Sequence, residues 1–550
     1  MKKLSSPIRT VCIAATVVAA VAGHARAQAV SDSRVSELLA QAKAQTAAMP
    51  QAKGPGAGLA MPGLELTMDE AVAKALQLNI DLAVARLNPL VQDWAISVAF
   101  GAYVPNVSAT LGERSITQTP GSQIGGGKTV NTKTTTYNFG ASEGLRWTGG
   151  TASVNWSNSR QETNNNLTTI NPRFDSGVQL QLLQPLWRNR SIDLNRQSIL
   201  TAEIDRLLAD VSLRATTINT VANTKNAYWD LVYAVQAVDA ARTSVALAQK
   251  LVDDNKVRVE IGTLAPLDVV TAQAEAAVRQ QTLVTTIANQ RTAELVLKRL
   301  IVSGTSDPIW NATLNPTDRP PTDFSEKIDL EGALRTALQN RTDVVTARKN
   351  LEISDVGLRY QRNQAMPGLD LTATYTTAGV GGIVTNPPPP IPGGYWDALA
   401  QLARFQLPTW NVQVVFSYPI GTSIQDATYA RSKVQYQQSL AQLKSLELSV
   451  ATDLTTQALT VQSSLEAVQA AVAARELSKQ SLDAEQSKFE VGMSTNYNVV
   501  LAQRDYIDAQ NSELRAVLNY RKALVDWQRK QETSSSGGGS SIVGGTSSGS

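Results

Sequence analysis

The sequence contains one stretch twice, and this internal repeat limits the fold more than any other feature. Residues 66–105 and 328–367 align at a constant offset without a gap, and the two copies end at Pro105 and Pro367. After each proline, apolar residues alternate with polar ones, which is typical of a half-exposed strand. Because a repeat sets the architecture of a whole chain, we expect a helical segment that leads through a proline into a strand, twice.

The N-terminus has the pattern of a secretory signal peptide, which we expect to comprise residues 1–27. Its basic residues are Lys2, Lys3 and Arg9. The apolar segment 11–21 that follows is too short to span a bilayer. Residues 25–27 read Ala-Arg-Ala, a small-x-small cleavage site.

Removal of this segment excludes several kinds of site. Cys12 and His24 are the only cysteine and the only histidine. The predicted mature chain therefore has no disulfide, no zinc site built on Cys or His, and no His-based triad. We expect no metal and no cofactor. Of the 50 basic residues four are lost, which leaves 46 against 47 acidic ones, so the composition does not predict nucleic-acid binding.

The remaining pattern predicts two units of the same plan. After an N-terminal extension and linker (28–63), the first repeat covers 64–327 and the second 328–530, followed by a disordered Ser/Gly-rich tail (531–550). Strands are expected at about 105–117, 176–185, 367–377 and 409–419. Long helices are expected at 186–300 and 424–530, interrupted at Gly262 and Gly492.

Four principal strands with one apolar and one polar face cannot close a membrane barrel alone, since the smallest barrels have about eight strands. The chain is therefore expected to oligomerise. Between the first two strands, residues 137–156 form a further alternating hairpin with a Gly-Gly turn. We expect this hairpin to lie outside the barrel wall; the alternative is two additional wall strands in each chain.

The chain resembles the outer-membrane efflux protein family, the TolC-like channels. The residues that carry the resemblance are 66–71, 104–105, 184–187, 227–231, 259–263 with 268–270, and 491–493 with 498–500. The resemblance implies a mixed all-α plus membrane β fold: a homotrimer with a twelve-stranded barrel in outer-membrane lipid, continuous with a long periplasmic α-helical barrel. It also implies the exit duct of a tripartite efflux pump or type I secretion system, passive transport of small molecules or proteins, and partnership with a periplasmic adaptor and an inner-membrane transporter.

Three groups of residues are candidates for function. The two helix turns are expected to form a periplasmic tip that docks the adaptor, through Ile261, Gly262, Thr263, Pro266, Val491, Gly492, Met493 and Thr495. A pore entrance is expected at Asp268 and Asn498, although a carboxylate in a first helical turn also stabilises the helix dipole. The helix–strand junctions are expected at Pro105, Pro185, Pro367 and Pro419.

Further residues and alternative functions also follow from the sequence. Trp187 and Tyr418, beside strand-ending prolines, are expected in an interfacial aromatic girdle. Arg86 and Arg348 occupy matching repeat positions and are expected to form helix salt bridges. A structural coiled-coil envelope protein that spans the periplasm without transport is the alternative function. An enzyme is not expected, because no spaced catalytic constellation is present.

Overall fold

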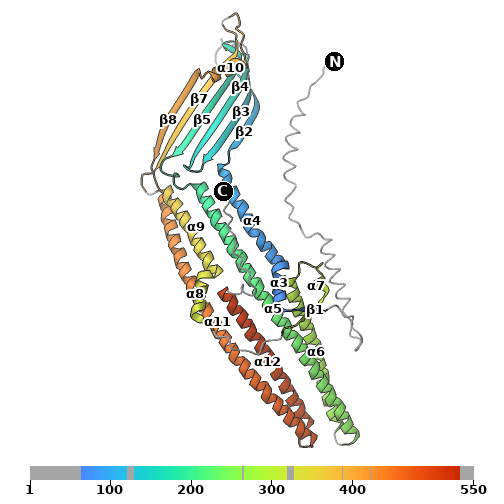
Figure 1. Ribbon diagram of the computed structural model, residues 1–550. Coiled ribbons are helices and arrows are strands. Elements are labelled where there is room, and N and C mark those ends of the chain that lie inside the picture. The colour runs from blue at the N-terminus through green and yellow to red at the C-terminus, as the bar shows by residue number, and fades with distance from the viewer. Residues whose placement is uncertain are drawn as a thin grey trace, which may run out of the picture. The chain divides into compact units, whose positions relative to one another are not determined.

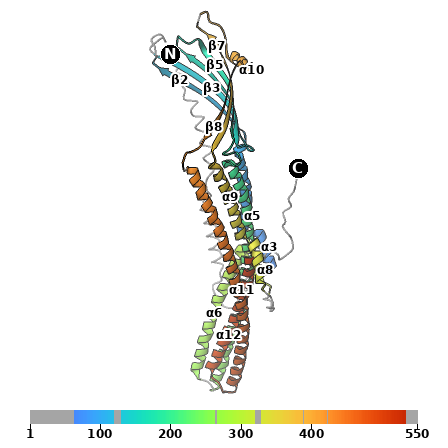
Figure 2. The same cartoon turned by 90° about the vertical axis from the view of Figure 1, so that its left-hand side faces the viewer.

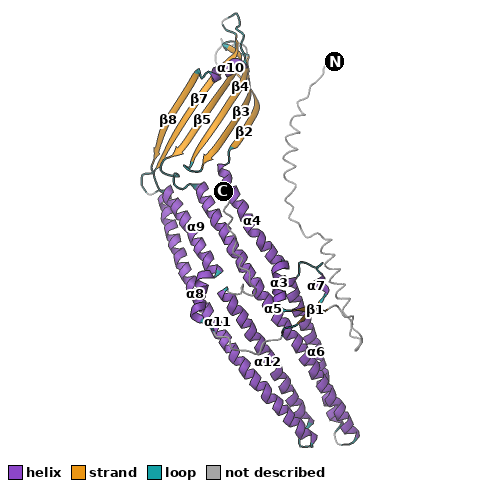
Figure 3. Cartoon of the chain, in the orientation of Figure 1, coloured by secondary structure: helices purple, strands orange, loops and turns teal. Residues whose placement is uncertain are grey.

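The computed structural model describes residues 63–119, 129–262, 265–318, 328–386, 388–421 and 423–532. The expected signal peptide, almost all of the extension and all but the first two residues of the expected tail lie outside the described residues. Within the described chain, one large sheet is joined to a set of long helices (Figure 1, Figure 3).

Six strands of the described chain form one antiparallel sheet. They are β2 (Asn106–Gln118), β3 (Val130–Leu145), β4 (Gly150–Thr163), β5 (Ile170–Pro185), β7 (Gly368–Val384) and β8 (Leu407–Ser417). Their order in the sheet is β2-β3-β4-β5-β7-β8, so β2 and β8 are the edges. Every residue of these two strands is exposed, and neither edge has a further pairing partner within the described residues.

The expectation that the 137–156 hairpin lies outside the wall is wrong for this sheet. β3 pairs with β2 and β4 pairs with β5, so both hairpin strands lie in the middle of the sheet. The register places Phe139 between Ala109 and Trp156, and Trp156 beside Val178. The alternation within the hairpin therefore continues the apolar face of its neighbours, and the chain supplies six strands instead of about four.

The sheet has two chemically different faces. By register and alternation, one face carries apolar side chains, among them Leu111, Phe139, Val154, Leu180, Ala373 and Val412. The opposite face carries polar ones, among them Thr110, Asn138, Asn155, Gln179, Thr374 and Asn411. A short helix, α10 (Tyr395–Ala403), lies on one side of the sheet (Figure 2).

Two long helices continue from the sheet. α5 (Leu194–Glu260) and α11 (Ile424–Glu490) each contain 67 residues, or about 100 Å at 1.5 Å per residue. They return through α6 (Pro266–Ile301) and α12 (Asn496–Gln531). The expected start of the first helix at residue 186 is wrong, because Asp193 caps α5 by accepting a hydrogen bond from the Arg196 N–H at 2.7 Å.

In both copies of the repeated stretch, residues 66–105 and 328–367, the helical segment consists of two helices instead of one. α3 (Met68–Leu78) meets α4 (Ile80–Phe100) at Asn79, and α8 (Leu330–Asn340) meets α9 (Thr342–Gln364) at Arg341. The buried Asn79 side chain accepts from the Leu82 N–H at 2.9 Å and donates to the Leu300 carbonyl at 3.0 Å. These bonds satisfy the amide at the break and tie it to α6.

Two apolar cores hold the helices together. The first includes Leu66, Tyr228, Leu231, Leu297 and Leu314, and it joins α5 and α6 to the short strand β1 (Gly63–Leu66). β1 pairs in parallel with β6 (Thr313–Pro316), which follows the short helix α7 (Pro308–Asn311). The second includes Val344, Val450, Leu454, Tyr520 and Trp527. Lys522 of α12 contacts both carboxylate oxygens of Asp230 of α5 at 2.9 Å. No helix within the described ranges is long and apolar enough to cross a membrane.

Candidate functional site

The two helix turns expected at the docking tip have the same backbone conformation. Gly262 has φ 78° and Gly492 has φ 79°. Each glycine N–H donates to a carbonyl three residues back, Val259 at 3.0 Å and Phe489 at 3.2 Å. Among the described residues beyond each glycine's chain neighbours, no atom lies within 4 Å of where a Cβ would stand. The left-handed backbone, and not crowding, is what favours glycine at both turns.

Apolar side chains flank both glycines and are exposed. Ile261, Val491 and Met493 are 68 %, 71 % and 80 % exposed. Pro266 lies in the first turn of α6, where its missing N–H has no helical partner to lose. Thr495 is the N-cap of α12 but its side chain makes no capping hydrogen bond. Thr263 lies outside the described residues.

The two polar residues expected at a pore entrance lie in separate hairpins. Asp268 is in the first turn of α6, and its N–H donates to the Ala265 carbonyl at 3.0 Å. Asn498 is in the first turn of α12, where its amide donates to Ser494 Oγ at 3.4 Å. No hydrogen bond joins these two side chains among the described residues.

A further charge lies beside the second turn. Ser494 donates a hydrogen bond to Glu485, and Lys488 Nζ lies 3.1 Å from the same carboxylate. The Ser494 hydrogen bond and then Lys488 lower the pKa of Glu485. The turn therefore keeps a negative charge to lower pH than an isolated glutamate would.

One contact that the sequence did not predict joins the two turns. The Arg258 guanidinium of α5 lies 4.3 Å from the centroid of the Phe489 ring of α11. This is a cation–π distance, and it brings the ends of the two long helices together near Gly262 and Gly492. The sequence gave only a weak indication of this contact, namely a cation (Arg258) and an aromatic residue (Phe489) that each lie about one helical turn before a glycine.

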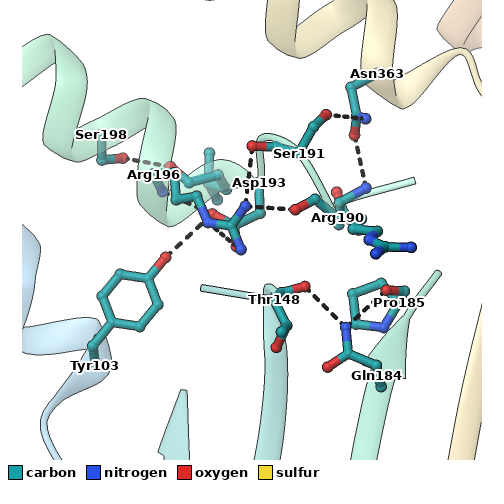
Figure 4. Close-up of polar contacts among 12 residues, drawn as sticks. Tyr103, Thr148, Gln184, Pro185, Arg190, Ser191, Asp193, Arg196, Ser198 and Asn363 are labelled. Carbon is teal, nitrogen blue, oxygen red and sulfur yellow. Dashed lines mark hydrogen bonds and ion pairs between the residues drawn. The ribbon is translucent and has the colours of Figure 1, made fainter. Parts of the chain in front are cut away.

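The junction between sheet and helices is held by a polar network (Figure 4). Arg196 Nη1 donates to the carbonyls of Arg190 at 2.6 Å and Ser191 at 3.0 Å. Asn363 of α9 accepts from the Asn189 N–H at 2.7 Å and donates to Ser191 Oγ at 3.0 Å. Asn189 has φ 69°, a left-handed conformation that asparagine tolerates better than most residues. The second repeat thus holds the loop that starts the long helix of the first.

The four junction prolines lie at strand ends. Pro105 follows the short 3₁₀ helix η2 (Gly101–Tyr103) and directly precedes β2. Pro185 is the last residue of β5 and lies opposite Asp370. Pro367 directly precedes β7, and Pro419 follows the end of β8.

The polar network around Asn363 could not be predicted from the repeat. The position that matches Asn363 in the first copy is Gly101, which has no side chain to form such a network.

Residues 333–528, most of the second repeat, match the outer membrane efflux protein family. This match confirms the family resemblance. Among curated proteins, none matches the sequence.

Solved structures of outer-membrane channels share the fold. The channel OprN has a TM-score of 0.60 and 16 % identity over 84 % of this chain and 89 % of that one. The Campylobacter jejuni channel CmeC has a TM-score of 0.60 and 14 % identity over 88 % and 94 %. The Neisseria gonorrhoeae channel MtrE, in its open state, has a TM-score of 0.56 and 17 % identity over 88 % and 97 %. The fold is therefore that of the TolC-like outer-membrane channels.

Proposed function

We propose that three copies of this chain form an outer-membrane channel that is the exit duct of a tripartite efflux pump or type I secretion system. The observation that carries the proposal is the pair of free edges on one sheet. β2 and β8 are exposed along their whole length, and the outer edge of each has no pairing partner within the described residues. In a membrane, such edges must pair with another strand, because no water is present to satisfy them.

Pairing of β2 of one copy with β8 of the next closes the sheet into a ring. Three copies of a six-stranded sheet give about 18 strands, within the known range for membrane barrels. This is wider than the twelve strands implied by the family resemblance. The apolar face would meet lipid and the polar face would line a water-filled lumen, through which substrates pass without an energy-consuming step in this protein.

The opposite end of the assembly suits protein partners. Exposed apolar residues at both turns, Ile261, Val491 and Met493, offer a surface to a periplasmic adaptor, which would connect the duct to an inner-membrane transporter. Three copies of Asp268 and Asn498 would place polar groups at the entrance. The family resemblance supports this assignment, and the two matching left-handed glycine turns make it specific.

Conductance of the purified protein in a planar bilayer tests the channel. We expect stepwise, long-lived currents, together with a trimer after chemical crosslinking in detergent. A folded protein that stays monomeric and conducts no current would instead favour a structural coiled-coil protein that spans the periplasm.

A further inference from the structure

The short helix α10 has apolar side chains on both of its sides. Toward the sheet, Ala398 is fully buried, and the Tyr395 ring lies 5.7 Å from Tyr137 and 6.0 Å from Phe174. Away from the sheet, Trp396 is 80 % exposed, and Ala400 and Ala403 follow at helical spacing. An amphipathic surface helix would carry polar residues on its outer side. This helix carries a tryptophan there, next to the exposed Asp397, whose carboxylate accepts a hydrogen bond from the Gly394 N–H at 2.7 Å.

α10 rests directly on the backbone of β7. A Cβ at Gly379 would stand 2.0 Å from the Ala398 carbonyl oxygen, and one at Gly381 would stand 2.1 Å from the Gly394 carbonyl oxygen. By strand alternation, these glycines point to the same side as Leu371 and Ala373. The helix therefore covers the far end of the apolar face of the sheet.

The helix is also fixed to the free edge of β7. The pairing of β7 with β8 ends at Ala378 and Leu407. Beyond this point, the Gln401 side chain accepts from the Val380 N–H at 3.2 Å and donates to the Val380 carbonyl at 2.8 Å. Because both backbone groups are satisfied by one side chain, α10 is seated in a defined position on the sheet (Figure 2).

The residue that follows Arg404, the C-cap of α10, is in a strained conformation. Phe405 has φ 51°. Its N–H donates to the Leu402 carbonyl at 3.0 Å, and the Gln406 N–H donates to the Gln401 carbonyl at 3.2 Å. These are the bonds of a Schellman motif, in which glycine normally holds the left-handed position. A bulky residue there is an outlier, yet the Phe405 side chain is 58 % exposed, so packing within the chain does not explain it.

We propose that α10 is an interfacial anchor that binds the phosphate-bearing lipid of the outer leaflet. Trp396 and Phe405 lie among the upper acyl chains, and Arg404, which is exposed at the end of the helix, meets lipid phosphates. The proposal rests on the proposed channel, since it requires the apolar face of the sheet to contact lipid. Lipid is the occupant because the exposed side chains are continuous with that face and end in a cation.

The position of α10 along β7 fits this role. From Leu369, near the junction, to Gly379, a strand advances about 33 Å at 3.3 Å per residue. For strands tilted by about 40°, this corresponds to roughly 25 Å of height, the height of the apolar band of a membrane barrel. α10 therefore lies at the outer border of the band, where tryptophan is enriched in membrane proteins.

Depth-dependent quenching tests the anchor. In a Cys12→Ser background, the full chain carries one cysteine, introduced as Trp396→Cys, Trp410→Cys or Thr374→Cys and labelled with an environment-sensitive nitrobenzoxadiazole fluorophore. The protein is placed in phosphatidylglycerol/phosphatidylethanolamine vesicles that contain lipid brominated near the headgroup or deep in the acyl chain. Iodide, present on both sides, reports exposure to water.

The three sites give different expected results. The label at the Trp396→Cys site should be quenched most by shallow bromine, and the label at Trp410→Cys, on the apolar face of β8, by deep bromine. The label at Thr374→Cys, on the polar face, should be quenched by iodide alone. In the seat variant Gly379→Val, shallow quenching at Trp396→Cys should be lost. The matched control Gly394→Ala, where a Cβ meets no atom within 4 Å, should keep it.

Each other outcome has a distinct meaning. Lipid quenching at Trp410→Cys with iodide quenching alone at Trp396→Cys would overturn the anchor and leave the channel intact. Protection of the Trp396→Cys label from both iodide and bromolipid would mean that protein covers α10, which also overturns the anchor. Absence of lipid quenching at Trp410→Cys would overturn the membrane assignment of the sheet itself, and the anchor with it.

Discussion

Arg86 and Arg348 make the same hydrogen bond at corresponding positions of the two repeats. Arg86 Nη2 donates to the Leu76 carbonyl at 2.7 Å, and Arg348 Nη2 donates to the Leu338 carbonyl at 3.0 Å. Each bond crosses the break between a short and a longer helix and satisfies a carbonyl near the end of the short one. Arg348 also forms the expected salt bridge, at 3.7 Å from Glu447, whereas the expectation is wrong for Arg86, which forms no salt bridge within the described residues.

Removal of this donor should destabilise the second repeat. Arg348→Met keeps the side-chain length but removes both the hydrogen bond to the Leu338 carbonyl and the half-exposed salt bridge to Glu447. Loss of the hydrogen bond should cost about 1 kcal/mol, and loss of the salt bridge should add little. Arg335→Met is the matched control, because Arg335 is mostly exposed and, within the described residues, forms its ion pair with Glu331 of its own helix. It should cost about 0.5 kcal/mol or less. Thermal melting followed by circular dichroism compares them, and equal melting midpoints would show that the bond across the break contributes nothing.

Tyr228 should make the stability of the protein fall at alkaline pH. Its buried hydroxyl lies 3.0 Å from the Leu66 carbonyl and 2.9 Å from Asp318 Oδ2, and the Asp318 N–H donates to it. Burial, as the main cause, raises its pKa from 10.0 to about 12. The stabilising contribution is therefore complete below pH 10 and is lost as the pH rises toward 12.

Comparison with Tyr228→Phe isolates this effect. The variant should be less stable at pH 7 by roughly 1–2 kcal/mol, since it leaves buried polar groups unpaired. Between pH 10 and about 12 the difference between the two proteins should shrink, because only the wild type loses the Tyr228 contribution. Melting curves across this range provide the measurement. A constant difference would contradict the assignment of the raised pKa to this residue.

Deletion of the central hairpin should prevent assembly. Removal of residues 137–156, with a short Gly/Ser linker in their place, takes out most of β3 and the first half of β4, which separate β2 from β5. We expect no crosslinked trimer, because β2 would lose its neighbour and the ring could not close. Normal trimer yield would show that the hairpin does not belong to the wall.

The glycines of the two turns should be needed for adaptor docking and not for folding. Gly262→Leu and Gly492→Leu force a side chain into the left-handed region, at about 1–2 kcal/mol each; the added Cβ has open space at both positions among the described residues beyond its chain neighbours. Trimers should form, whereas crosslinking to the adaptor and export should be lost. Gly357→Ala in α9, with equally open surroundings, should behave as wild type. Normal export by both turn variants would show that the docking site lies elsewhere.

The repeat and the alternation predicted much of the fold because each depends on local spacing. Leu231, Val238 and Val252 are buried in α5 and recur at multiples of seven residues, the spacing of one face of a coiled-coil helix. The turns at Gly262 and Gly492 could be predicted because glycine interrupts a helix. The place of the hairpin could not be predicted, because alternation shows that a segment is a strand but not which strand it pairs with.

Long-range partners account for the remaining differences. The break at Asn79 depends on its bond to Leu300, far along the chain, and the link between Arg258 and Phe489 depends on the packing of two separate helices. The position of α10 depends on glycines of β7 that have no side chain to collide with it. This requirement becomes evident only when the helix is placed against the strand. None of these contacts has a signature within a window of neighbouring residues.

Disulfide formation between β2 and β8 of different copies tests the central claim most directly. In a Cys12→Ser background, Thr110→Cys is combined in turn with Thr409→Cys, Asn411→Cys or Gln413→Cys, all on the polar face of the two edge strands. Within one chain, β2 and β8 are the first and last strands of the sheet and are therefore too far apart for this disulfide. We expect one of the three pairings to give a covalent trimer on a non-reducing gel. Folded protein that stays monomeric in all three combinations would contradict it.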